Sequence, residues 1–329
     1  MIKLIWVLIF IITLAGCERE ISGTRITDSA VNLGELNSIY DDYNSDIGHP
    51  VQSTEIYFSS NRKSAGDNFD IVTGIINFAY YEEEKVLTFD IPDHVLVSYK
   101  SSLILGKVNN SNDQFGPFTY YVGAYYEGED NLLFMYATQT DGRFGVNFVE
   151  LSNYSSNYNL VTDSVEVPGI NDIGDNMYPS IGVDNKKMYF CSNRNDSVFN
   201  IYSAQYTSEI SGQVLRDGNI EKIEKESVLS SPYDDKCPYT EWNMMVFTSN
   251  RPGGFGGYDL YYSHIKDGKW STPKNFGEKI NSEYDEFRPV IFSFADAGSH
   301  IMVFSSNRPE GKGGFDLYIV NIDDFRSQE

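Results

Sequence analysis

A five-residue phrase recurs along the chain and constrains its fold more than any other feature. Each copy begins with Phe, continues through two small residues and ends in Asn-Arg, at Asn61-Arg62, Asn193-Arg194, Asn250-Arg251 and Asn307-Arg308. The last three copies are separated by equal intervals of 57 residues. A fixed period of this size is typical of like supersecondary units arranged in series. The sequence therefore predicts a repeat architecture.

Each phrase lies within a longer frame of short extended stretches. An Asp-x-x-x-Pro motif precedes it, beginning at Asp46, Asp175, Asp234 and Asp285, and a Gly-rich turn with an aromatic stretch follows it. Short aromatic and apolar runs bounded by Gly, Asn and Asp predict strands joined by tight turns. Since no long apolar period of 3.6 residues is present, we expect little helix. These features predict an all-β chain that forms a single β-propeller with blades of four antiparallel strands.

The number of blades and the closure of the ring follow from the spacing of the copies. A weaker copy at 133–148 gives five blades, and an insertion at 93–112 is expected to form a hairpin. A sixth, short blade within that insertion is the alternative, and five blades are favoured. The chain stops soon after the third strand of the last copy. We therefore expect residues 25–33 to supply the missing outer strand and to close the ring, which removes exposed sheet edges.

The first residues have the pattern of an export signal. Lys3 precedes an apolar run at 4–14, and Leu-Ala-Gly stands directly before Cys17. A short apolar run after a positive charge predicts a secretory signal rather than a membrane span. The segment resembles the bacterial lipoprotein box, which implies lipidation of Cys17 and an outer-membrane anchor, and a plain cleaved signal is the alternative. The predicted organisation is a signal at 1–16, a lipidated tether at 17–24, the propeller at 25–323 and a tail at 324–329.

Composition and motifs narrow the classes of function. The net charge of −22 opposes binding to nucleic acid and to anionic surfaces. No serine-hydrolase, zinc-protease or P-loop motif is present, and the four histidines show no ligand spacing. Asp42, Asn44 and Asp46 resemble the start of a calcium loop but lack its later ligands, so no cofactor is expected and calcium is an open alternative. We therefore expect no catalytic residues and no metal site.

The residues before each first strand are the candidates for binding. If the first strand is the innermost one, these residues surround one mouth of the central channel. Their carboxylates could bind a cation or a basic partner, or could accept backbone N–H groups in the loop. Their aromatic rings could contact a partner or pack between blades. The candidate set is Asp46, Asp175, Asp234, Asp285, Tyr178, Tyr233 and Tyr284.

Two further features have structural interpretations. The Arg of the phrase is followed eight residues later by Asp in three copies, as Arg62 and Asp70, Arg251 and Asp259, and Arg308 and Asp316. We expect these pairs to staple the turn between two strands, with Asn200 facing Arg194 in the remaining copy. Cys191 and Cys237 are expected to be buried small residues, and a disulfide between them is left open.

The complete frame resembles the TolB-type, WD-like β-propeller repeat of Gram-negative envelope proteins. The resemblance is close at 234–322, good at 46–72 and 175–206, and poor at 80–165. It implies a non-enzymatic propeller that contacts other envelope proteins. The expected function is therefore an outer-membrane lipoprotein that acts as an interaction scaffold. The alternative is a propeller that binds or cleaves glycans. Two carboxylates that face each other across a deep central pocket would favour the glycosidase.

Overall fold

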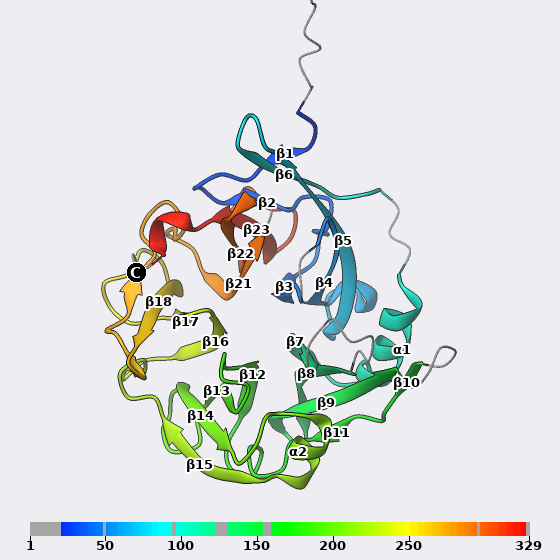
Figure 1. The fold of residues 1–329 in the computed structure, drawn as a ribbon, viewed down its shortest axis with the longest axis vertical. Helices are drawn as coiled ribbons and strands as arrows, with labels where there is room; N and C mark the ends of the chain where they lie inside the picture. The colour runs from blue at the N-terminus through cyan, green and yellow to red at the C-terminus, as the bar shows by residue number, and fades with distance from the viewer. Residues whose placement is uncertain are drawn as a thin grey trace, which may run out of the picture.

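The computed structural model describes residues 21–48, 51–93, 97–122, 131–153, 159–294 and 297–326. Five small antiparallel sheets surround a common axis and form a five-bladed β-propeller, as Figure 1 shows. The prediction of an all-β fold is confirmed, and the favoured number of five blades is correct. The predicted signal at 1–16 and Cys17 lie outside the described residues. No described helix is long and apolar enough to cross a membrane.

The innermost strand of each blade is the first strand of its repeat unit, and these strands begin at Asp42, Gln114, Asn176, Asp235 and Glu286. Blade one contains β3 (Asp42–Asp46), β4 (Ser53–Ser60), β5 (Asp70–Tyr81), β6 (Val86–Asp90) and β1 (Thr24–Arg25). Blade two contains β7 (Gln114–Val122), β8 (Asn131–Thr140), β9 (Arg143–Asn153), β10 (Asn159–Val161) and β11 (Val165–Glu166). Blade three contains β12 (Asn176–Ile181), β13 (Lys187–Ser192), β14 (Asn200–Tyr206) and β15 (Ile220–Lys225).

The last two blades complete the ring. Blade four contains β16 (Asp235–Glu241), β17 (Met244–Ser249), β18 (Asp259–Lys266), β19 (Lys269–Trp270) and β20 (Lys274–Asn275). Blade five contains β21 (Glu286–Phe294), β22 (Ser299–Ser306), β23 (Asp316–Asn321) and β2 (Val31–Asn32). Short helical segments are η1 (Arg62–Ser64), α1 (Tyr99–Val108), α2 (Gly212–Asp217) and η3 (Asp323–Phe325).

The N-terminal segment closes the ring as predicted. In β2, Val31 lies opposite Ile319 of β23, so the last blade takes its outer strand from the start of the chain. Leu33 continues the pairing by donating its backbone N–H to the carbonyl of Leu317, and its side chain is fully buried. One further contact was not anticipated: Thr24 and its neighbour in β1 extend blade one by pairing with β6.

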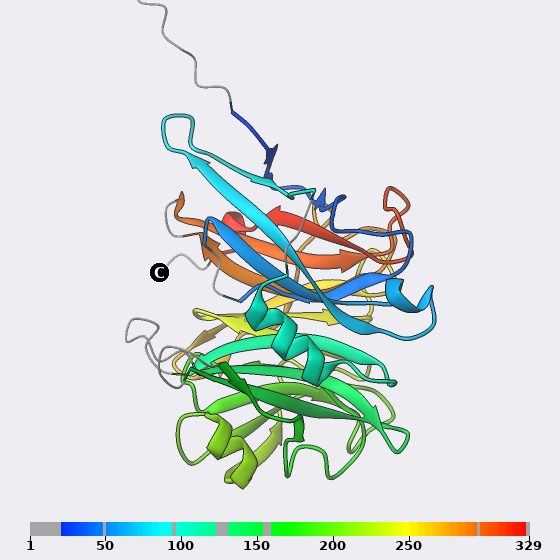
Figure 2. The ribbon, with the colours of Figure 1, turned by 90° about the vertical axis from the view of Figure 1, so that its right-hand side faces the viewer.

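The insertion at 93–112 contains a helix, which corrects the predicted hairpin. Helix α1 runs along the outside of the propeller beside blades one and two (Figure 2). Ser98 caps its N-terminus by accepting the backbone N–H of Ser101. Ser101, Ile104 and Val108 are buried against the two blades, a spacing that places them on one face of a helix. Because this period covers only two to three turns, it was too short to be detected.

The Asn-Arg phrase joins the end of the second strand to the first strand of the same blade. In blade four, the side-chain oxygen of Asn250 accepts the backbone N–H of Asp234 at 2.9 Å. The guanidinium of Arg251 donates to Asp235 at 2.6 Å and to the carbonyl of Leu229 at 2.7 Å. The same contacts recur at the other three copies, with Asp42, Asn176 and Glu286 in the place of Asp235.

These contacts correct the predicted Arg–Asp staples and the facing of Arg194 by Asn200. Asp259 accepts the N–H groups of Phe255 and Gly256 in the Gly-rich turn, and Asp316 does the same in blade five. Asp70 instead forms an ion pair with Lys63 at 3.4 Å. Turn amides therefore satisfy Asp259 and Asp316, and Lys63 pairs with Asp70, so none of the three carboxylates is paired with the predicted Arg. Each Arg pairs instead with a residue at the start of the inner strand of its own blade, as Arg251 does with Asp235.

A double-mutant cycle distinguishes the two assignments. We expect Arg251→Met and Asp235→Asn to be coupled by about 1–3 kcal/mol in the free energy of unfolding, because the two side chains form a shielded ion pair. Arg251→Met and Asp259→Asn should be coupled by less than about 0.5 kcal/mol. Urea denaturation of the single and double variants measures both terms. A larger coupling to Asp259 would restore the predicted staple.

A ring of five Asp residues connects neighbouring blades. Asp175 accepts the backbone N–H of Phe144 from the preceding blade at 2.9 Å. Equivalent bonds of 2.8–2.9 Å are made by Asp41, Asp113, Asp234 and Asp285. In blade one this repeat position is held by Asp41. The prediction that Asp46 is the equivalent of Asp175, Asp234 and Asp285 is therefore wrong. The motif that begins at Asp113 was missed because the surrounding copy is degraded.

Candidate central pocket

Each innermost strand contains a β-bulge, and these bulges occupy the centre of the propeller. The pairing register shifts at the same point in all five strands. One residue at each bulge has a positive φ of 49–57°: Asn44, Gly116, Tyr178, Cys237 and Arg288. Pro follows four of these positions, and a bulge tolerates Pro because its N–H is not needed for the ladder. The Asp-x-x-x-Pro motif is therefore the sequence signature of the bulge.

The bulge residues fill the middle of the channel. Arg288 is fully buried and donates a hydrogen bond to the carbonyl of Pro117 at 2.9 Å. Its guanidinium carbon lies 5.7 Å from the ring centroid of Tyr178 and 6.0 Å from that of Tyr239. A Cβ at position 116 would meet the Tyr178 ring at 2.3 Å, so Gly is required there. The channel is therefore a packed plug rather than an open pore.

A pocket of about 510 Å³ lies at the C-terminal ends of the five inner strands. All five blades contribute to its wall, which places it on the propeller axis. Aromatic and small residues dominate the lining: Gly48, Val51, Phe118, Thr119, Tyr120, Tyr121, Ile181, Gly182, Val183, Asn185, Tyr239, Thr240, Glu241, Ile291, Phe292 and Ser293. Such a pocket has the size of a small-molecule site.

Glu241 is the one carboxylate among the described residues that line this pocket. It is the last residue of β16 and lies opposite Met244 across a two-residue turn. Burial raises the pKa of its carboxyl group to about 7. A carboxylic acid with this pKa is partly protonated near neutral pH and can donate a proton.

Asp46 is a second carboxyl group with a raised pKa, and it lies beneath the lining. Its Oδ2 accepts the backbone N–H of Thr119 at 2.9 Å and the hydroxyl of Thr119 at 2.6 Å. Burial raises the pKa of Asp46 to about 6, although Thr119 and Arg288 oppose the shift. Both Asp46 and Glu241 act on Tyr239, whose pKa is raised well above its usual value mainly by burial. The Tyr239 ring therefore lies within range of both acids.

The pKa of Asp46 predicts a pH dependence of stability. Between about pH 4 and pH 6 the folded state binds more protons at this group than the unfolded state, so stability falls as the pH rises. Relative to the Asp46→Asn variant, the wild-type free energy of unfolding should fall by roughly 3 kcal/mol across this range. Urea titrations at successive pH values measure the difference. Parallel curves for the two proteins would show that Asp46 has an ordinary pKa.

The structure places the predicted site residues apart from this pocket. Asp175, Asp234 and Asp285 are the blade connectors, and Tyr233 and Tyr284 are exposed beside them. They precede the inner strands, whereas the pocket lies at the opposite ends of those strands. Tyr178 is buried in the plug, and Asp46 alone approaches the pocket. Within the described ranges, no group of three or more acidic, His or Cys side chains could hold a metal ion.

Glu241 was not singled out from the sequence because it belongs to no motif. The one sequence signal that could have identified Glu241 is its position at the end of an inner strand, directly before a turn that begins with Trp242. Cys191 and Cys237 are both buried, free thiols that pack in one cluster with Tyr178.

Comparisons with known proteins show where this fold recurs. No family model and no curated protein matches the chain. Solved structures do. A thermostable family-43 glycoside hydrolase has a TM-score of 0.51 at 12% identity, with 85% of this chain and 88% of that chain covered. An endo-arabinase from Bacteroides thetaiotaomicron has a TM-score of 0.51 at 11% identity, with 90% and 97% covered. An α-L-arabinofuranosidase from Podospora anserina, in complex with cellotriose, has a TM-score of 0.51 at 9% identity, with 91% and 97% covered.

These similarities correct two expectations from the sequence. The chain was expected to be a non-enzymatic scaffold because its repeat resembles TolB-type proteins. The similar structures are instead described as a family-43 glycoside hydrolase, an endo-arabinase and an α-L-arabinofuranosidase. This contradicts the expectations of a scaffold and of a chain that is not an enzyme, and it favours the alternative of a propeller that cleaves glycans. At identities of 9–12% the similarity shows the fold alone. Evidence for an activity has to come from the residues of the central pocket.

Proposed function

We propose that the central pocket binds a glycan and cleaves a glycosidic bond, with Glu241 as the proton donor. The observation that carries this proposal is the position of Glu241: a carboxyl group with a pKa of about 7 at the wall of an axial pocket. Glycosidases protonate the leaving oxygen with a carboxylic acid whose pKa is raised in this way. The half-buried rings of Tyr120 and Tyr121 would pack against the apolar faces of sugar rings.

The second carboxyl group that this chemistry requires is assigned to Asp46. The hydroxyl of Thr119 donates to Asp46 and also lines the pocket. In the proposed step, water attacks the anomeric carbon and passes its proton to the Thr119 oxygen, while the hydroxyl proton of Thr119 moves to Asp46. Glu241 donates its own proton to the departing oxygen. The products are two sugars, and both carboxyl groups then exchange their protons with solvent.

Arabinose-containing polysaccharides are the substrates to test first, because two of the similar structures are an arabinase and an arabinofuranosidase. The purified protein should release reducing sugars from arabinan or arabinoxylan, measured against a heat-treated sample. If no arabinose-, xylose- or hexose-containing polysaccharide is cleaved by the wild-type protein, the proposed activity is wrong.

A second candidate function is glycan binding without cleavage. It is favoured by the complete burial of Asp46, which leaves Glu241 as the only carboxylate on the described wall. Affinity electrophoresis in gels that contain the same polysaccharides separates the two candidates. Retardation without release of reducing sugars would identify a binding protein.

We propose that the export pattern determines where the protein is anchored and that the repeat determines how its blades are held together. Neither feature specifies the activity. A lipid on Cys17 would hold the propeller at the outer membrane by a tether of a few residues. A structural role of the Asn-Arg phrase is supported by the hydrogen bonds that its Asn and Arg side chains form within the blade. Incorporation of labelled palmitate into the wild type, but not into Cys17→Ala, tests the anchor.

A further inference from the structure

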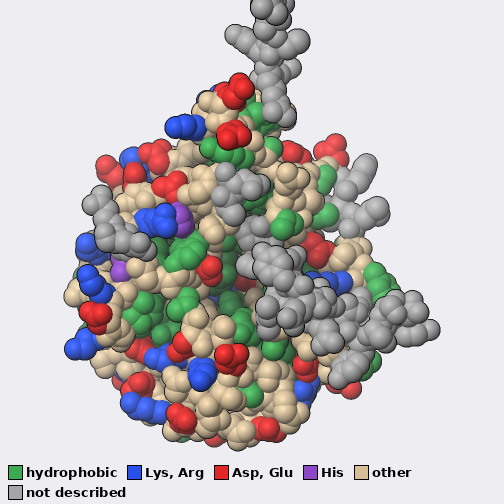
Figure 3. Space-filling view, in the orientation of Figure 1, with side chains coloured by type: hydrophobic (Ala, Val, Ile, Leu, Met, Phe, Trp, Pro, Cys, Tyr) green, Lys and Arg blue, Asp and Glu red, His purple; other side chains and the backbone are tan. Residues whose placement is uncertain are grey.

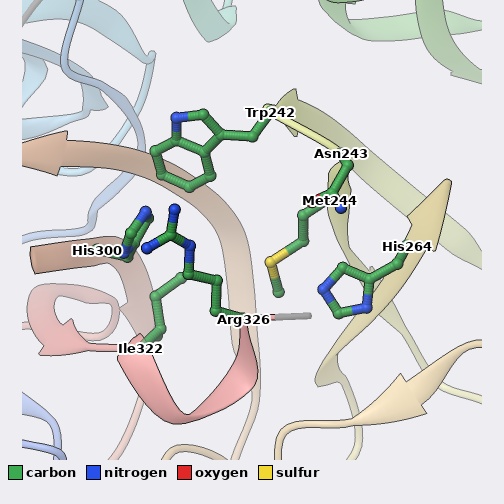
Figure 4. A pocket seen from close by; sticks show the side chains of 7 residues that line it. All are labelled: Trp242, Asn243, Met244, His264, His300, Ile322 and Arg326. Atoms are coloured by element: carbon green, nitrogen blue, oxygen red, sulfur yellow. The ribbon is translucent and has the colours of Figure 1, made fainter. Parts of the chain in front are cut away.

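A second cavity, of about 240 Å³, lies between blades four and five. Its wall contains the rings of Trp242 and His264 from blade four, the ring of His300 from blade five, and the cationic side chain of Arg326 from the C-terminal segment (Figure 4). The lining residues are Trp242, Asn243, Met244, His264, His300, Ile322 and Arg326. We call this cavity the Trp242 pocket. It is smaller than the cavities of roughly 300–1,000 Å³ that hold drug-sized ligands, so it suits a single sugar ring.

The rings of the Trp242 pocket are held in fixed positions. The centroids of Trp242 and His300 lie 4.4 Å apart in an edge-to-face arrangement. Nδ1 of His300 lies 3.0 Å from a carboxylate oxygen of Asp323, and its backbone N–H donates to the same oxygen at 2.7 Å. Asp323 is therefore already engaged. In Figure 4 the guanidinium of Arg326 extends toward Trp242, and His264 lies on the other side of Met244.

Trp242 has a backbone conformation that disfavours a large side chain. It is the first residue of the two-residue turn between β16 and β17, and its φ is +51°. Gly, Asn and Asp are preferred at such positions. Other turns of this chain follow that preference, as at Asp141-Gly142 and Asp267-Gly268. Backbone strain of this kind clusters at functional sites, and Ala65 and Lys85 of this chain share the conformation.

Arg326 gives the Trp242 pocket one positive charge on a protein whose net charge is −22. Arg326 is exposed and forms no ion pair within the described part of the chain. Burial and the nearby Lys274 lower the pKa of His264, against a hydrogen bond to the backbone of Phe325, so its ring is neutral near pH 7. On the face shown in Figure 3, Lys and Arg side chains lie beside the two described histidines. The carboxylate of an acidic ligand would pair with Arg326.

We propose that the Trp242 pocket binds a uronic acid residue of the glycan, with Arg326 paired to its carboxylate and Trp242 packed against its ring. Trp242 directly follows Glu241, so one hairpin supplies both the proton donor of the central pocket and the aromatic platform of this one. The inference rests on the proposed function and narrows it to glycans that carry acidic sugars. Arg suits this role because its planar fork matches a carboxylate.

Tryptophan fluorescence tests the proposal, since Trp242 and Trp270 are the only Trp residues beyond Trp6. The full-length Trp270→Phe variant should respond to methyl glucuronide, and the Trp242→Phe variant should not. The methyl ester of the same sugar keeps the ring but loses the charge, so it should bind at least about tenfold more weakly. Arg326→Met should weaken binding of the free acid by a similar factor and leave binding of the ester unchanged. Lys269→Met removes an exposed charge of blade four and should change neither.

Equal binding of acid and ester, or undiminished binding by Arg326→Met, would overturn the proposal. Its failure is distinguishable from failure of the proposed function. If neutral arabinan is cleaved and uronides do not bind, only the acidic specificity is wrong. If uronides bind as expected and no polysaccharide is cleaved, the Trp242 pocket stands as a binding site and the assignment of Glu241 is wrong.

Discussion

Glu241→Gln should lower the rate of glycan cleavage by about 10²–10⁴-fold. The amide has the shape of the acid but cannot donate a proton with a suitable pKa. Because Glu241 is a half-buried acid with a raised pKa, its replacement should not destabilise the fold at neutral pH. Initial rates of reducing-sugar release from the two proteins measure the effect, and unchanged thermal unfolding shows that the fold is intact.

Two controls make this result specific to Glu241. Glu278→Gln removes the same charge at an exposed position and should retain the wild-type rate. The wild-type rate should also fall as the pH rises above about 7, since the donor form of Glu241 is lost through its pKa. A Glu241→Gln variant with at least half of the wild-type rate would show that another group donates the proton.

Deletion of residues 30–36 should abolish cooperative folding of the propeller. The deletion removes β2 and the buried side chains of Leu33 and Leu36. Loss of one buried Leu alone costs about 2–5 kcal/mol, against a total stability of about 5–15 kcal/mol for a typical domain. The unpaired edge of β23 would then be free to pair with another chain. We expect a broad urea transition and aggregates in size-exclusion chromatography.

Deletion of residues 21–27 is the matched control. It removes the same number of residues and the exposed strand β1, but it keeps β2 in place. This variant should remain monomeric and should lose at most about 1–2 kcal/mol, because β1 buries little apolar surface. If both deletions had the same effect, closure by β2 would not be the source of the stability of the ring.

The repeat made the fold predictable because its copies encode the same contacts. Asn250 and Arg251 recur since every blade must join its second strand to its first. The blade at 133–148 lacks the Asn-Arg phrase, and its Asp-x-x-x-Pro motif, which begins at Asp113, was therefore missed. The wrong partner for Arg251 arose because spacing along the chain does not show which of two nearby carboxylates has already been satisfied by turn amides.

The candidate site was less predictable, because it lies where the copies differ. The five bulge positions share one backbone conformation but hold Asn44, Gly116, Tyr178, Cys237 and Arg288. Motif-based reasoning selects residues that repeat, whereas a single axial site needs residues that occur once. Glu241 and Trp242 are of that kind. Asp46 was selected for its place in a supposed motif, and its relevance comes instead from its burial beside Thr119.

A crystal structure of the Glu241→Gln variant with an arabino-oligosaccharide tests the central claim most directly. The account predicts a sugar ring in the axial pocket, stacked on Tyr120 or Tyr121, with its glycosidic oxygen within hydrogen-bond distance of residue 241. Oligosaccharide bound only at the opposite end of the channel, beside Tyr233 and Tyr284, would contradict it.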